Sequence, residues 1–230
     1  MQFIWVMDTY VDTNGVPTGW AVMSASEADR LISSSRLISE IENEDPNIAD
    51  GPLSVEQHWL ITGRHRAPNE DLPVPKPSNF VRPGVIQSAD PASQAFRTSG
   101  LYTCSPASQS GNGMWEIYLD MFPSGAPVRP WAVWALEVPD CPVAEITSAT
   151  DWTRFVDRYG YSVRDMLHPE WDRAAADFAA VHLTARAVAA AQGFSFETSR
   201  GLTAPVFWDV EQTLWLRWSF GSTRLLRRYE

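Results

Sequence analysis

The sequence predicts a single-domain α+β protein, and three observations support this prediction. Strand-like and helix-like segments follow one another in no regular order along the 230 residues, which favours α+β over a doubly wound sheet. Serine-led capping-box patterns at residues 26–29 and 148–151 indicate the starts of two helices. Residues 131–138 are almost entirely apolar, as in a strand that is covered on both faces. We expect central mixed or antiparallel twisted sheets with flanking helices.

The N-terminal quarter predicts a hairpin and a helix. Residues 3–7 and 19–23 have strand character, and an Asn-Gly pair between them is typical of a tight turn. The helix that begins at residues 26–29 is expected to end near Glu42, before Pro46. We expect residues 1–55 to pack on a main domain of residues 56–230, whose first strand covers 58–63.

Six prolines mark residues 67–93, where neither a helix nor a strand ladder can continue. A loop of this length inside a domain is usually functional or disordered. We expect it to be a loop of the main domain that borders the site as a lid or acceptor-recognition segment.

The second half of the chain contains the clearest elements. Residues 100–104 and 131–138 are predicted strands, and the helix that begins at 148–151 should stop at Gly160. The alanine-rich residues 169–193 fit one long helix, or a helix, a strand at 181–184 and a second helix. In both cases Pro169 suits the first turn and Gly193 the position after the last. Residues 206–209 and 214–220 are strand-like by their aromatic content.

The net charge and the absence of several known motifs argue against several classes of function. A net charge of −10 disfavours nucleic-acid binding, which depends on clustered cations. The two cysteines form no CxxC motif, and the four histidines have no metal-ligand spacing. There is no P-loop, no GxGxxG before a helix and no GxSxG elbow. The N-terminus lacks a signal peptide and no apolar run reaches membrane-spanning length, so we expect a cytoplasmic protein that binds no metal and no membrane. The 11 tryptophans favour core packing over ligand stacking.

Three segments suggest a site when they are taken together. Residues 58–66 form a strand that ends in two arginines and a histidine; residues 99–108 form a glycine turn, a short strand and a small-residue stretch; residues 206–216 form a strand, an acidic turn and a strand. In this order they resemble the ADP-ribosyltransferase superfamily, which cleaves NAD. The resemblance spans residues 56–220 and implies an ADP-ribosyltransferase-like fold with NAD as a substrate.

The resemblance also implies which residues bind NAD. Arg64 or His65 would meet the nicotinamide ribose or the phosphates. Tyr102 would stack on the nicotinamide, and Gly100 would let the backbone approach it closely. Ser105 and Ser108 would lie in the small-residue stretch after that strand.

A carboxylate is also required, because cleavage of the glycosidic bond develops oxocarbenium character. One branch of the family has it a few residues before the segment that matches 206–209, where this chain has alanine and proline. Glu197 is the first choice of catalytic acid, and Asp209 and Glu211 are the others.

The function that these residues predict is transfer of ADP-ribose from NAD to a macromolecular acceptor. The acceptor is expected to be a protein rather than a nucleic acid, because the chain is acidic. The alternative is a non-enzymatic domain that binds a protein partner through the proline-rich loop or exposed aromatic side chains.

Overall fold

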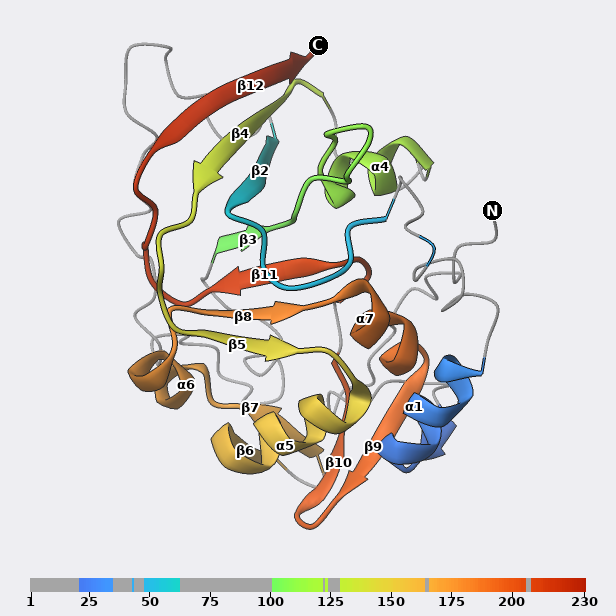
Figure 1. The fold of residues 1–230 in the computed structure, drawn as a ribbon. Helices are drawn as coiled ribbons and strands as arrows, with labels where there is room; N and C mark the ends of the chain where they lie inside the picture. The colour runs from blue at the N-terminus through green and yellow to red at the C-terminus, as the bar shows by residue number, and fades with distance from the viewer. Residues whose placement is uncertain are drawn as a thin grey trace.

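The computed structural model describes residues 21–34, 43, 48–62, 101–121, 123, 129–163, 166–205 and 208–230. Within these ranges the chain is a mixed α+β protein with three sheets (Figure 1). The helices are α1 (Ala25–Ser33), α4 (Met114–Met121), α5 (Ala149–Tyr159), α6 (Trp171–Asp177) and α7 (Ala185–Ala191). The predicted class is therefore correct. The strand predicted at residues 3–7 and the loop predicted at 67–93 lie outside the described residues.

Two of the sheets are mixed and one is antiparallel. The five-stranded sheet has the order β1 (Ala21–Met23), β9 (Phe194–Thr198), β10 (Gly201–Thr203), β7 (Met166–Pro169) and β6 (Gly160–Val163). The four-stranded sheet has the order β3 (Leu101–Thr103), β11 (Gln212–Trp215), β8 (Ala180–Leu183) and β5 (Val143–Ile146). The antiparallel three-stranded sheet has the order β12 (Thr223–Tyr229), β4 (Trp131–Glu137) and β2 (Glu56–Thr62).

The four-stranded sheet lies between the other two in Figure 1. A large core cluster fills the side of this sheet that faces α5, and includes Trp152, Phe196 and Leu214. A second cluster lies on the other side, toward the three-stranded sheet, and includes Trp134 and Trp215. Alternate residues of each central strand therefore enter different cores, as the twofold period of a strand requires.

Several elements that local sequence patterns predicted are confirmed in the structure. Ser148 caps α5 by accepting a hydrogen bond from the Asp151 amide at 3.0 Å. The helix ends at Gly160, where any Cβ would collide with the Val156 carbonyl. Residues 131–137 form β4, buried along most of its length and central in its sheet. The helix–strand–helix alternative for 169–193 is correct, since α6, β8 and α7 occupy this stretch.

Other boundaries differ from the prediction. Ser24 caps α1, because its side chain accepts from the Glu27 amide and leaves Ser26 inside the helix. Pro169 ends β7 instead of opening a helix. The predicted strand at 214–220 is shorter and shifted, since β11 ends at Trp215 and the chain then bends. Trp208 and Asp209 are not in a strand, and residues 206 and 207 are not described.

Asp29 joins two helices far apart in sequence. Its carboxylate accepts hydrogen bonds from the Ala149 amide at 2.7 Å and the Thr150 amide at 3.0 Å, in the first turn of α5. We expect Asp29→Ala to lower the free energy of unfolding by about 1–2 kcal/mol, as for other lost N-terminal caps. Urea denaturation would measure the loss. Asp157→Ala, an exposed change on the same helix, is the control and should stay within about 0.5 kcal/mol of wild type.

Candidate functional site

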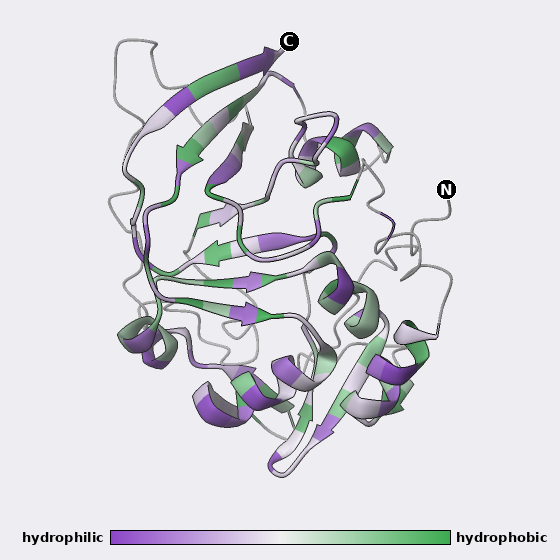
Figure 2. Cartoon of the chain, viewed as in Figure 1, coloured by the Kyte–Doolittle hydropathy of each residue, from purple (hydrophilic) through white to green (hydrophobic). Residues whose placement is uncertain are grey.

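A row of polar side chains crosses one face of the four-stranded sheet. Glu145, His182, Thr213 and Thr103 are register partners on β5, β8, β11 and β3. In Figure 2 the strands β5 and β8 each carry a hydrophilic band between hydrophobic ones, and their sequences, VAEI and AVHL, each contain one such residue. A buried His, Thr or Glu needs hydrogen-bond partners to offset its desolvation, so these residues are expected to bond to one another or to nearby polar groups.

On one side of the row, hydrogen bonds form a chain in which each group donates to the next. Trp215 Nε1, which can only donate, binds Thr103 Oγ1 at 2.9 Å. Thr103 Oγ1 then donates to Gln57 Oε1 at 2.7 Å, and Gln57 Nε2 donates to Ser105 Oγ at 2.9 Å. The Ser105 hydroxyl therefore has its proton free to donate to Glu211 Oε1, at 2.8 Å. Glu211 is the final acceptor of this chain of bonds.

Glu211 is almost fully buried, with 2% of its surface exposed, and is surrounded by donors. Oε1 accepts from Ser105 Oγ and, at 2.9 Å, from His182 Nε2. Oε2 accepts one hydrogen bond from the described residues, from the Ser105 amide at 2.9 Å. Because a carboxylate oxygen can accept about two hydrogen bonds, Oε2 has a place left for a ligand.

His182 lies between two carboxylates. Its Nδ1 is 2.6 Å from Glu145 Oε2 and its Nε2 is 2.9 Å from Glu211 Oε1. Burial by itself would lower the pKa of His182, but the hydrogen bonds to Glu145 and Glu211 outweigh it and raise the pKa to about 9. His182 is therefore an imidazolium at neutral pH, and donates one hydrogen bond to each carboxylate.

Glu145 forms the outer end of this group. Its side chain is 34% exposed, and its Oε1 accepts a hydrogen bond from the Leu53 amide at 3.0 Å. Burial would raise the pKa of Glu145, but the hydrogen bond and the charge of His182 lower it. Glu145 is thus a second anion that orients the imidazole ring.

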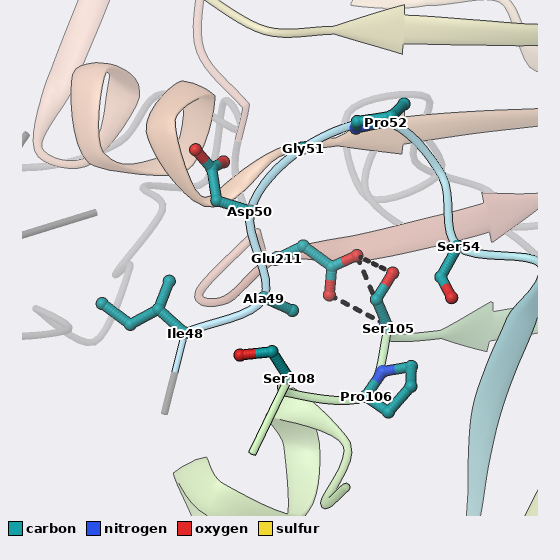
Figure 3. Close-up of a pocket in the computed structure, with 10 residues that line it drawn as sticks. All are labelled: Ile48, Ala49, Asp50, Gly51, Pro52, Ser54, Ser105, Pro106, Ser108 and Glu211. Carbon is teal, nitrogen blue, oxygen red and sulfur yellow. Dashed lines mark hydrogen bonds between the residues drawn. The ribbon is translucent and has the colours of Figure 1, made fainter. Parts of the chain in front are cut away.

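A cavity of about 300 Å³ lies against Glu211. Three parts of the chain line it: the loop before β2, the segment after β3, and Glu211 just before β11 (Figure 3). Its lining residues are Ile48, Ala49, Asp50, Gly51, Pro52, Ser54, Ser105, Pro106, Ser108 and Glu211. Asp50 is held by α7, because the Arg186 amide donates to its Oδ1 at 3.3 Å. The cavity wall is thus acidic, with hydroxyl groups beside the carboxylates.

A second buried carboxylate shows how a purely structural one differs. Glu116 accepts from Arg227 Nε at 2.6 Å, the Tyr229 hydroxyl at 2.8 Å and the Gly113 amide at 2.8 Å. Arg227 Nη2 adds a bond at 2.9 Å, and His58 Nδ1 lies 3.5 Å away. Burial would raise the pKa of Glu116, but these partners lower it to about 2. Both of its oxygens are fully used to tie α4 to β12, whereas Glu211 Oε2 is not.

Three of the residues predicted from the sequence meet at the cavity: Ser105, Ser108 and Glu211. Glu197 is not among them, since it is exposed on β9 in the five-stranded sheet, opposite Leu202. Asp209 is half-buried two residues before Glu211 and is not a lining residue. Arg64, His65 and Gly100 lie outside the described residues.

Tyr102 lies on the other side of β3 from the polar row. It packs against the large core cluster and meets Trp208 edge to face, with ring centroids 6.2 Å apart. Its neighbour Leu101 belongs to the second cluster. The stacking role of Tyr102 stays a prediction.

Sequence reasoning missed His182, Glu145 and Gln57, and also the loop at residues 48–54. One signal was available: His182 and Glu145 each interrupt a short apolar run of strand character. A charged or titratable residue at such a position is rarely buried without a partner, so it marks a polar contact inside a core.

The described residues contain no group of three or more His, Cys, Asp or Glu side chains arranged to hold a metal ion. No helix among them is long and apolar enough to cross a bilayer. No family model matches this sequence, and neither a curated protein nor a solved structure matches it.

Proposed function

We propose that the cavity at Glu211 binds the nicotinamide-ribose end of NAD, and that the protein transfers ADP-ribose to a macromolecular acceptor. One observation supports this most directly: Glu211 is a buried carboxylate, surrounded by donors, with acceptor capacity left on Oε2 at the wall of a cavity. Ribose hydroxyls are donors, and the reacting sugar carbon becomes electron-poor, so both suit a carboxylate in this place.

The arrangement of strands also favours the proposal. The three segments that resemble the ADP-ribosyltransferases are neighbours: β2 meets the end of β3 through a bridge between His58 and Cys104, and β3 pairs with β11. A cavity of about 300 Å³ is at the small end of ligand sites. It suits the nucleoside half of NAD, with the rest of the dinucleotide outside it.

In the proposed reaction the bond between C1′ of the ribose and the nicotinamide nitrogen breaks, and its electron pair leaves with neutral nicotinamide. Glu211 stabilises the positive charge that develops on the ribose, and a nucleophile of the acceptor then bonds to C1′ and loses its proton. A carboxylate fixed before the reaction does this without reorganising, which is the main source of such catalysis.

Glu211→Gln and Glu197→Gln test the proposal as a pair. We expect Glu211→Gln to lower nicotinamide release from NAD by roughly 100-fold or more, because the carboxylate acts on charge that develops in the transition state. NAD binding should change little. Glu197→Gln is the matched control, since this glutamate is exposed in another sheet, and should leave the rate unchanged.

Nicotinamide release by chromatography, with labelled NAD to follow transfer to protein, gives the rates, and calorimetry gives the affinity. Circular dichroism verifies that the buried substitution still folds. If the unmutated protein fails to bind NAD at millimolar concentration, the proposed function is wrong. If turnover survives Glu211→Gln but not Glu197→Gln, the site is wrong and the reaction stands.

A further inference from the structure

The orientation of the Glu211 carboxylate is fixed by hydrogen-bond donors from two parts of the chain, and one of these parts is the segment after β3. Ser105 contributes its amide and hydroxyl, at 2.9 Å and 2.8 Å. His182 contributes the third donor, from the neighbouring strand β8, at 2.9 Å. The two sources hold Oε1 from different parts of the chain, so the plane of the carboxylate is fixed and Oε2 remains open at the cavity.

We infer that His182 and Glu145 are positioning residues for Glu211: the imidazole fixes Oε1 through Nε2, and Glu145 holds the ring in place through Nδ1. This inference rests on the proposed function for its effect on turnover. Without the imidazole N–H, the donors to Glu211 among the described residues would all come from Ser105, and the carboxylate would no longer be held from two sides.

Glu145 acts through the ring and does not reach the cavity. It is a register partner of His182 on β5 and is absent from the cavity lining. Its bond to Nδ1 at 2.6 Å and the Leu53 amide at its other oxygen set the direction of the imidazole. A carboxylate that orients a histidine in this way commonly tunes the group at the second ring nitrogen.

The charges that face His182 come from Glu145 on β5 and from Glu211, the residue before β11. Asp50, on the loop beside the cavity, is paired with Arg186 of α7 at 4.0 Å. When His182 loses its proton, one ring nitrogen becomes an acceptor, so the two carboxylates compete for a single N–H. Glu211 then loses its counter-charge, and it loses its donor as well when the remaining N–H is at Nδ1, so activity should fall at alkaline pH.

Glu145→Gln tests this at a distance from the cavity. The substitution removes one of the two anions, so His182 should deprotonate roughly 1–3 pH units lower, as expected for the loss of a close opposite charge. The alkaline limb of the kcat/KM profile should move down by the same amount, with activity recovered at lower pH. His182→Gln, which retains a donor but cannot titrate, should show no such limb. Glu197→Gln should leave the profile of the unmutated protein unchanged.

A ligand-free measurement separates this inference from the proposed function. Nitrogen NMR of the imidazoles should show His182 deprotonating near pH 9 in the unmutated protein and lower in Glu145→Gln. The carboxyl carbon shift of Glu211 should change together with it. His168, whose pKa burial lowers to about 4, is an internal reference.

The outcomes are distinct. If Glu145→Gln lowers the pH at which His182 deprotonates and the protein shows no NAD turnover, the positioning pair is supported and the proposed reaction is rejected. The inference is wrong if Glu145→Gln changes neither the pH at which His182 deprotonates nor the alkaline limb of the kcat/KM profile, whatever the result with NAD.

Discussion

Trp134→Ala is expected to lower the free energy of unfolding by about 3–5 kcal/mol, the usual cost of removing a large buried aromatic side chain. Trp134 is 6% exposed on β4, the central strand of its sheet. It lies opposite Trp59 on β2 and Leu225 on β12, and it joins the cluster that contains Trp215. The cavity left by the indole would have neighbours from two sheets, which cannot all move in to fill it.

Urea denaturation followed by circular dichroism would measure this loss. Val55→Ala, at a side chain that is 78% exposed, is the control and should change stability by less than about 0.5 kcal/mol. A loss below about 1 kcal/mol in Trp134→Ala would show that the three-stranded sheet is not packed as described.

The second large effect is a loss of stability at alkaline pH. Hydrogen bonds to Glu145 and Glu211, acting against burial, raise the pKa of His182 to about 9, above its ordinary value of 6.5. A group whose pKa is raised in the folded state contributes its full stabilisation of the fold below its unfolded pKa, here 6.5. It loses that stabilisation as the pH rises to its folded pKa, here about 9. The loss over this window should be about 3 kcal/mol.

Among the described residues, His182 is the main source of this change in stability between pH 6.5 and pH 9. Burial raises the pKa of Cys104 well above 9.0, and burial with a hydrogen bond to Glu116 raises the pKa of Tyr229 to about 12, so both act at higher pH. Burial lowers the pKa of His168, which acts below 6.5. Denaturant midpoints at pH 6 and pH 9 would measure the slope. The His182→Gln variant should have a flat response, and an equal slope in this variant would contradict the assignment.

The elements that the sequence predicted well have signals contained in a few adjacent residues. Ser148 and Gly160 bound α5 by local hydrogen bonding and sterics, and β4 follows from one apolar run. The alanine-rich stretch left two alternatives because alanine favours a helix, while the strand within it forms through pairing with β5 and β11. Such distant partners are not visible in a single sequence.

The residues of the site likewise divide into those that the sequence could predict and those that it could not. The resemblance pointed to Ser105, Ser108 and Glu211, which come together at the cavity. It gave no reason to prefer Glu211 over Glu197, because that choice depends on which sheet each strand joins. His182 and Glu145 were missed because their meaning comes from parallel pairing of β5 with β8, between residues 37 positions apart.

The one-way direction of the bonds that end at Glu211 has a consequence for proton exchange. The branch through Ser105, Gln57 and Thr103 ends at Trp215, whose indole nitrogen donates and offers no lone pair in return. No proton can leave along this branch. The other branch passes through the two nitrogens of His182 to Glu145, which solvent reaches. Of these two branches, only the one through the imidazole therefore connects Glu211 to a group that solvent reaches.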